Sequence, residues 1–242
     1  MFFRFLTVSL LIFSSFSVQA KPFEQDSVLL SSKTLVITFI GHGSLKFEYE
    51  RKQIYIDPCS MFGDYSTMHK ADLILITHQH RDHFDSVAIS QIATNQTDIF
   101  LNQLSFKILK RGKILKNGDK VQWDGIIIET VPAYNLVHKR KDGRLFHPKG
   151  EGNGYVLTID GKRIYIAGDT ENTPEMKNLK DIFIAFLPMN IPYTMTPEMV
   201  ANAVKSFKPQ ILYPYHYGNT DVNVLLKLLQ SETIDIRIRQ MQ

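Results

Sequence analysis

Cysteine is almost absent from this sequence, in which Cys59 is the single one among 242 residues. One cysteine cannot form an intramolecular disulfide, so a hydrophobic core must stabilise the fold. Cys59 follows Asp57-Pro58, and we interpret it as a small buried hydrophobe rather than a nucleophile or metal ligand. Repeats, low-complexity tracts and interdomain linkers are also missing. We therefore predict a single domain over residues 21–242.

The sequence also lacks a large excess of charge. Its formal net charge is +4, and its basic residues are not massed together as they are in nucleic-acid-binding proteins. Nothing therefore favours DNA or RNA as a partner. Hydrophobic residues make up 44% of the chain, which is enough for the core of an ordinary globular domain.

Long hydrophobic runs are missing except near the N-terminus. There, Arg4 precedes an apolar region at residues 5–16, which the small-residue sequence Ser17-Val18-Gln19-Ala20 follows. This order predicts a signal peptide over residues 1–20 with cleavage after Ala20, and hence a periplasmic or secreted protein. The alternative is an uncleaved membrane anchor, but the region is short for a span of about 20 residues and serines interrupt it. No stable membrane span is expected after cleavage.

Segments typical of strands dominate the first part of the chain, and helical segments are interleaved in both halves. This order predicts an α/β fold in which two mixed β-sheets pack together with helices outside. Residues 21–33 are expected to form a polar leader before the first strand. Asn117-Gly118-Asp119 is typical of a hairpin turn, so we expect residues 114–115 and 121–123 to pair across it.

Helical segments are expected at several places. Residues 86–96 have helical spacing, with Val87 on the buried face. Residues 103–110 are predicted to form a helix that Gly112 ends, since glycine is common just past a helix C-terminus. Thr196-Pro197 indicates a helix start, with threonine as the N-cap and proline at the first helical position.

A cluster of histidines and aspartates follows an apolar run at residues 73–76 that is typical of a buried strand. In an extended segment, side chains at i and i+2 point the same way, so His78 and His80 can bind one ion. Asp82 and His83 face another direction and can reach a second ion about 3.5–4 Å from the first. Imidazole together with carboxylate favours zinc, manganese or iron over calcium or magnesium. The segment therefore predicts a transition-metal site.

Three further candidate ligands are His147 in a long basic loop, and Asp169 and His216 just past predicted strands. An isolated aspartate or histidine in such a position is usually a cap or turn residue. Several such residues together favour a shared site, because strand ends along one edge of a sandwich can converge on one site. Asp169 can bridge two ions, since a carboxylate offers two oxygens, and each ion would keep a position for water or substrate.

Three motifs together resemble the metallo-β-lactamase superfamily. They are His78-x-His80-x-Asp82-His83, Gly168-Asp169-Thr170 and Pro214-Tyr215-His216-Tyr217-Gly218. Gly41-His42-Gly43-Ser44 and Ile56-Asp57-Pro58 are similar to the branch that contains ascorbate-phosphate lactonase and the phospholipase D acting on N-acyl-phosphatidylethanolamine. The resemblance covers residues 35–238. It implies a four-layer αββα sandwich with a dinuclear metal site in the groove at its edge.

The resemblance also implies a role for each candidate ligand. His78 and His80 would bind the first metal, and Asp82 and His83 would bind the second. Asp169 would bridge the two ions. The second site would be completed by His216.

The third ligand of the first metal departs from the usual pattern. In the superfamily it is commonly a histidine soon after the strand that ends here at Val131-Pro132, but this chain has Ala133-Tyr134-Asn135 there. His147 is the replacement candidate, because Phe146 and Pro148 on either side can hold its ring in place. His138 is the second candidate, although the cations beside it favour solvent exposure.

These features predict a dinuclear metal-dependent hydrolase with two divalent ions, zinc in preference to manganese or iron. A metal-bound water has a lowered pKa, so hydroxide is available at neutral pH to cleave an ester, lactone or phosphodiester bond. Asp82 is the predicted catalytic residue, because it can orient that water or carry a proton. Zinc β-lactamases carry a cysteine where Asp169 stands, which argues against antibiotic hydrolysis.

The expected substrate is a small-molecule or lipid-like anion. The predicted substrate-binding residues are His42, Lys139, Arg140 and Arg144, since Lys and Arg favour phosphate and carboxylate. The same basic loop could instead be a solvated surface. A different class of function stays open, namely a metal-binding or sensor protein without turnover on the same fold. Iron redox chemistry would need an electron-transfer module that this single domain lacks.

Overall fold

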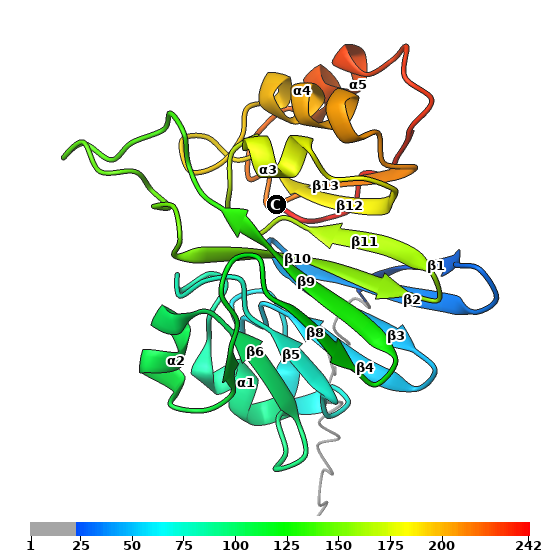
Figure 1. Ribbon diagram of the computed structural model, residues 1–242, viewed down its shortest axis with the longest axis vertical. Helices are drawn as coiled ribbons and strands as arrows, with labels where there is room; N and C mark the ends of the chain where they lie inside the picture. Colours follow the sequence, from blue (N-terminus) through cyan, green and yellow to red (C-terminus); the bar gives the residue numbers. More distant parts are fainter. Residues whose placement is uncertain (1–22) are drawn as a thin grey trace, which may run out of the picture.

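The computed structural model describes residues 23–242, so the predicted signal peptide lies outside the described residues. Two seven-stranded sheets pack against each other (Figure 1). The first contains β1 (Glu24–Leu29), β2 (Thr34–Gly41), β3 (Ser44–Tyr49), β4 (Lys52–Ile56), β5 (Leu73–Leu75), β6 (Asp98–Leu101) and β7 (Lys113–Ile114). The second contains β8 (Lys120–Trp123), β9 (Ile126–Ala133), β10 (Gly152–Ile159), β11 (Lys162–Ile166), β12 (Ile182–Pro188), β13 (Ile211–Tyr215) and β14 (Asp235–Ile236).

Both sheets are mixed and follow the same order. In each, the first four strands pair antiparallel and the last four pair in parallel. Parallel neighbours need crossover connections, and helices supply most of them. These are α1 (Ser86–Ile92) and α2 (Gln103–Leu109) for the first sheet, and α3 (Pro174–Lys177), α4 (Pro197–Phe207) and α5 (Val222–Leu228) for the second. The helices lie on the two outer sides (Figure 1), so the predicted αββα sandwich is confirmed.

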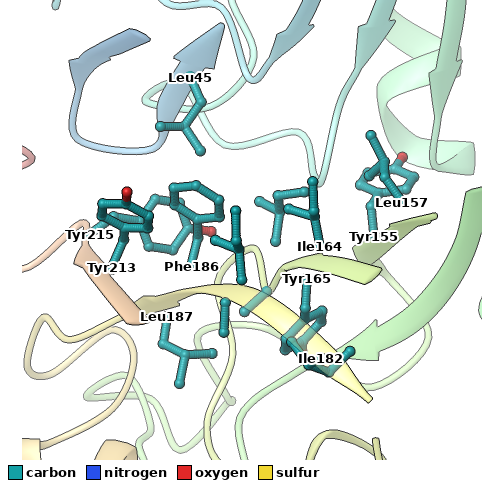
Figure 2. Packing of buried hydrophobic residues seen from close by; sticks show 14 of the residues in the cluster. Leu45, Tyr155, Leu157, Ile164, Tyr165, Ile182, Phe186, Leu187, Tyr213 and Tyr215 are labelled. Atoms are coloured by element: carbon teal, nitrogen blue, oxygen red, sulfur yellow. The ribbon is translucent and has the colours of Figure 1, made fainter. Parts of the chain in front are cut away.

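The main core lies between the two sheets. Figure 2 shows Leu45 of β3 pointing toward Phe186 and Tyr213 of the second sheet, while Leu187 points to the opposite face of its strand. The rings of Phe186 and Tyr213 stack with centroids 5.1 Å apart. Strand β5 is fully buried, because the second sheet covers one face and helix α1 the other. Its apolar run is what a strand covered on both faces requires.

The prediction of a polar leader over residues 21–33 is wrong. Strand β1 occupies most of this segment and pairs antiparallel with β2 along the edge of the first sheet. The sequence signal is weak because only Val28 of the strand is buried, and the neighbouring side chains are partly or fully exposed. Asp26 on this strand nevertheless accepts hydrogen bonds from Tyr213 and Arg239, which lie far along the chain.

The predicted hairpin around Asn117-Gly118-Asp119 is also wrong. Strand β7 before it pairs with β6 in the first sheet, whereas β8 after it pairs with β9 in the second. The turn is therefore the point where the chain crosses between sheets. An Asn-Gly pair favours a tight turn locally, but it does not determine which strands pair across it.

The helix predictions have mixed outcomes. Thr196 caps α4, its hydroxyl accepting a hydrogen bond from the Met199 amide, as expected. Val87 is exposed rather than buried, because it lies in the first turn of α1 on the solvent side. Lys110, not Gly112, adopts the left-handed conformation that ends α2. Within residues 23–242, no helix has the length and apolar character needed to cross a membrane.

Candidate metal centre

The candidate ligands lie on turns and loops that leave strands at one edge of the sandwich. They come from the β2–β3 turn (His42), the loop after β5 (His78, His80, Asp82, His83), the β9–β10 loop (His147), and the turns after β11 (Asp169) and β13 (His216). The amide of His216 donates to the carbonyl of His42 over 3.1 Å, which joins the two sheets at this edge. Residues separated by more than 170 positions thus meet at one place.

The first group of ligands contains His78, His80, His147 and Asp169, whose candidate ligand atoms lie within 4.8 Å of one another. Nε2 of His147 lies 3.1 Å from Nδ1 of His80 and 3.2 Å from Oδ2 of Asp169. Nε2 of His78 lies 3.7 Å from the same Oδ2 atom. His78 and His147 therefore lie around one oxygen of Asp169, and His80 joins them through its contact with His147.

The second group contains His42, Asp82, His83 and His216, again within 4.8 Å. Asp169 reaches this group with its other oxygen, because Oδ1 lies 3.2 Å from Nε2 of His83 and 3.5 Å from Nε2 of His216. Oδ2 of Asp82 lies 3.2 Å from Nε2 of His42 and 3.6 Å from Nε2 of His216. Asp169 thus lies between the groups with one oxygen toward each.

The unpaired atoms of the site fit transition-metal ions. Among residues 23–242, Oδ1 of Asp169 and Nε2 of His78, His83 and His216 are buried without a hydrogen-bond partner. Buried polar atoms are normally paired, so this cluster of unpaired atoms fits a site that binds a cation. Two donors on one tetrahedral zinc ion lie about 3.3–3.4 Å apart. The spacings of 3.2 Å from Asp169 to His83 and 3.5 Å to His216 are close to this value.

Two histidines of the first group, His78 and His80, have lowered pKa values. Burial, with a smaller contribution from His83, lowers the pKa of His78 well below its usual value. Burial and the neighbouring His147 lower the pKa of His80 to about 4. Both rings are therefore neutral at pH 7 and keep the lone pair that a metal ligand needs.

In the second group, carboxylates and imidazoles shift one another's pKa values. Burial favours a higher pKa for Asp169, but His216 and His83 outweigh it and hold that pKa well below its usual range. Burial favours a lower pKa for His83, but Asp169 and Asp57 outweigh it and raise that pKa well above the usual value. A divalent ion would replace the proton on His83, because a ligating imidazole must be neutral. Burial also opposes ionisation of Asp82, but the neighbouring imidazoles of His216 and His42 outweigh it and hold the pKa of this carboxyl below its usual range.

A groove of about 400 Å³ opens beside the two groups. It is lined by His42, His80, Arg81, Asp82, Arg140, Phe146, His147, Asp169, Asn190, Tyr193 and His216. Of the predicted substrate-binding residues, His42 and Arg140 line this groove. Arg144 lines an adjoining cavity with Arg140, but its guanidinium is exposed and paired with Asp142. Lys139 is exposed on the loop that extends beyond the sandwich (Figure 1) and lines neither cavity.

The two candidates for the third ligand of the first metal lie in different environments. His147 is buried against the first group, whereas Nδ1 of His138 lies 2.7 Å from Oε1 of Glu171, away from both groups. Asn135 follows the strand where a histidine is common, and its side chain contacts His147 rather than a ligand position. The geometry therefore favours His147 over His138.

Sequence reasoning did not predict the positioning roles of Asp57, Asn135 and Glu171, although it kept Asn135 as an alternative third ligand of the first metal. In the structure, these residues hold candidate ligands or their loop in position. Asp57 accepts a hydrogen bond from His83 and two from Thr77, whose hydroxyl oxygen lies 2.9 Å from Nδ1 of His78. A signal for Asp57 does exist, since it directly follows β4, and β4 is the neighbour of β5 in the sheet. Asn135 and Glu171 have no comparable local signal.

Comparisons with known proteins agree with this geometry. The profile of the beta-lactamase superfamily domain matches residues 36–216. A Thermococcus onnurineus protein named UPF0173 metal-dependent hydrolase is 33% identical over 196 residues, which cover 75% of this chain and 84% of the relative. A Pyrococcus abyssi relative of the same name is 32% identical over 197 residues, with the same coverage.

Solved structures have the same fold. A Parabacteroides distasonis crystal structure, described as a metal-dependent hydrolase, is 51% identical with a TM-score of 0.87, covering 91% of this chain and 100% of that one. A metallo hydrolase from the archaeon Ignicoccus hospitalis is 26% identical with a TM-score of 0.70, covering 86% of this chain and 95% of that one. The narrower resemblance to ascorbate-phosphate lactonase and the phospholipase D stays a prediction.

Proposed function

The chain belongs to the metallo-β-lactamase superfamily and is a metal-dependent hydrolase, and from this premise we propose that it works with two ions. The first would be held by His78, His80 and His147, and the second by Asp82, His83 and His216. Asp169 would bridge them. Zinc is the proposed metal, because its preferred ligands are the imidazole and carboxylate groups found here.

The observation that carries this proposal is the orientation of Asp169. Its Oδ2 lies 3.2 Å from His147 and its Oδ1 lies 3.2 Å from His83, so each oxygen serves a different set of histidines. A single ion would leave one of these oxygens, and the buried nitrogens around it, without a partner. Two ions satisfy both sets at once.

The proposed reaction is hydrolysis of an ester, lactone or phosphodiester. Divalent ions in this site would lower the pKa of water and polarise the oxygen of the bond to be cleaved. Asp82 would orient the attacking water, because its carboxylate is ionised and its side chain, which is 38% exposed, lines the groove. His42 would hold that carboxylate in place through the contact with Oδ2.

We further propose an anionic substrate that Arg140 binds. Arg140 lines the groove together with His80 of the first ligand group and Asp82 of the second. It packs over the ring of Phe146 at 5.0 Å, which supports the side chain from one side. Guanidinium groups match phosphate and carboxylate oxygens in geometry as well as charge.

The proposal is tested by metal content and turnover of the purified protein. We expect two transition-metal ions per chain by elemental analysis, together with hydrolysis of at least one of three probes: nitrophenyl acetate, a simple lactone and bis-nitrophenyl phosphate. Asp169→Ala should lose both ions and all turnover, whereas Asp142→Ala, an exposed aspartate on the β9–β10 loop, should keep both. Retention of two ions by Asp169→Ala would refute the bridge. Two bound ions without turnover on any probe would favour the non-catalytic sensor.

Export is a separate proposal. If residues 1–20 are a cleaved signal peptide, protein recovered from the cell envelope or medium should begin at Lys21. N-terminal sequencing decides this, and a mature protein that starts at Met1 would contradict it.

A further inference from the structure

Asn135 is the residue found where the superfamily pattern led us to expect a ligand. Its side chain is buried, and it contacts the ring of His147 and the carboxylate of Glu171. We propose that Asn135 and Glu171 act as positioning residues that hold the ring of His147 toward the first ligand group. The inference rests on the proposed role of His147 as a metal ligand.

The contact between Asn135 and His147 selects one form of the ring. Oδ1 of Asn135 lies 2.8 Å from both Nδ1 and the backbone amide of His147. An amide oxygen only accepts hydrogen bonds, so Nδ1 must carry a proton. The lone pair then lies on Nε2, the atom that is 3.1 Å from His80 and 3.2 Å from Asp169.

The orientation of the Asn135 amide follows from its other partners. Nδ2 donates to Oε1 of Glu171 over 3.0 Å and to the carbonyl of Tyr193 over 2.9 Å. Both partners are acceptors, and both donors of His147 lie on the opposite side of the amide. A rotated amide would put its NH₂ group against two N–H groups and its oxygen against two oxygens. The network therefore permits only one orientation.

Glu171 fixes the start of the loop that carries His147. Its carboxylate is fully buried and accepts backbone hydrogen bonds from Leu136, Val137 and His138 at 2.7–2.8 Å, besides the one from Asn135. Its own amide donates to the carbonyl of Tyr134. Glu171 lies two residues after Asp169, so the loop is tied to the turn that supplies the proposed bridging ligand.

His147 needs such support because no strand or helix orients it. It lies in the β9–β10 connection, whose tip at residues 139–144 is exposed. Asn135 and His147 each donate a backbone hydrogen bond to the other residue. The backbone N–H of His147 donates to Oδ1 of Asn135, and the backbone N–H of Asn135 donates to the carbonyl of His147 over 2.9 Å. Partners that orient metal-binding histidines contribute about 10–100-fold to metal affinity. Asn135 would thus let a loop histidine replace a ligand that normally follows the strand.

The test is a Co²⁺ and Zn²⁺ titration of four variants of the purified protein. These are Asn135→Ala, His147→Ala, the double variant, and Glu171→Gln, with Glu175→Gln as the matched control. Glu175 also binds this loop, through Tyr134 and Lys149, but it does not contact His147 or Asn135. Near-ultraviolet circular dichroism of the chelator-treated proteins reports whether each variant is folded.

We expect Asn135→Ala to weaken binding of the first ion about 10–100-fold while affinity for the second ion is unchanged. The double variant should bind no more weakly than His147→Ala alone, because Asn135 acts only through that ring. Glu171→Gln should also lower affinity for the first ion. This variant tests the inference if Asn135→Ala does not fold. Glu175→Gln should bind as the unmodified protein does, and the Co²⁺ absorption spectrum should change only in variants of the positioning residues and His147.

Several outcomes would overturn the inference. Unchanged first-site affinity in Asn135→Ala, with a loss in His147→Ala, would overturn the positioning role alone. So would additive losses in the double variant, because Asn135 would then act independently of His147. Unchanged affinity in His147→Ala would overturn both this inference and the ligand assignment on which it rests.

Discussion

Nδ1 of His83 lies 2.8 Å from a carboxylate oxygen of Asp57, and both side chains are completely buried. This contact leaves Nε2 of His83 free to point at Asp169. The same Asp57 carboxylate accepts a hydrogen bond from the hydroxyl of Thr77, whose oxygen lies 2.9 Å from Nδ1 of His78. Asp57 therefore orients one histidine directly and a second through Thr77, one from each ligand group.

The first prediction concerns Asp57→Asn. An asparagine can accept with one oxygen only, and its NH₂ group would face the donors of His83 or Thr77. We expect affinity for the second ion to fall about 10–100-fold and affinity for the first ion to fall less, because that contact is indirect. Competition titration with a chelator measures both constants. Asp85→Asn is the control, since asparagine is an equally good N-cap for α1. Equal losses in the two variants would contradict the prediction.

The second prediction concerns Gly43, which packs against His83. A Cβ atom on residue 43 would lie 2.5 Å from Cε1 and 2.8 Å from Nδ1 of that ring. Asp57 holds the ring through Nδ1, so His83 cannot move away from a larger residue 43 without disturbing the contact with its buried partner. Gly43→Ala should therefore lower affinity for the second ion at least tenfold and destabilise the fold by about 1–3 kcal/mol.

A glycine control separates these two effects. Gly118 has a φ of +88° with open space around its Cβ position, so Gly118→Ala introduces backbone strain far from the ligand groups. It should lower the melting temperature and leave metal content unchanged. If Gly43→Ala bound both ions as tightly as Gly118→Ala does, contact with His83 would not limit the second site.

Local patterns allowed the sequence to predict much of the fold and site. The apolar run that contains β5 is continuous because both its faces are covered, which is a property of neighbouring residues. His78 and His80 at i and i+2 do lie in one group, and Thr196 does cap α4. Each of these depends on a few adjacent side chains. Sequence reasoning is reliable where the controlling interaction is local.

The missed features depend on contacts between distant segments. Strand β1 is stabilised by pairing with β2 and by Arg239 at the other end of the chain, so its own residues give little signal. Glu171 is buried where it accepts hydrogen bonds from backbone N–H groups of residues that lie more than 30 positions earlier in the chain. Single polar residues such as Asn135 are common in loops, and only the three-dimensional contact with His147 distinguishes this one.

The third prediction separates the two arginines of the β9–β10 loop. Arg140 lines the groove, whereas Arg144 pairs with Asp142 and its side chain is 78% exposed. Arg140→Ala should raise KM for an anionic substrate about tenfold with little change in kcat, because it removes binding rather than chemistry. Arg144→Ala should change neither constant. Steady-state kinetics with bis-nitrophenyl phosphate and uncharged nitrophenyl acetate measure this, and an equal effect on both substrates would exclude a charge-specific role for Arg140.

The fourth prediction concerns the stability of the sheet edge and not the metal centre. Asp26 on β1 accepts hydrogen bonds from Tyr213 and Arg239, and Arg237 lies 3.5 Å away. Burial alone would raise the pKa of Asp26, but the hydrogen bonds from Tyr213 and Arg239 outweigh it and lower that pKa. Asp26→Asn should reduce the free energy of unfolding by about 1.5–3 kcal/mol at pH 7, since it removes a charged hydrogen-bond acceptor.

The pH dependence of this loss follows from the lowered pKa. A carboxylate whose pKa is lower in the folded than in the unfolded state stabilises the protein above its unfolded pKa of about 3.9, and this stabilisation disappears as the pH falls through the folded value. Urea unfolding with chelator present should therefore show a smaller difference between Asp26→Asn and the unmodified protein at about pH 3 than at pH 7. Asp235→Asn is the matched control, because Asp235 also pairs with Arg237 but is half exposed, so its loss should cost little. A difference for Asp26→Asn that stayed constant with pH would mean that its charge contributes nothing to holding β1 on the sheet.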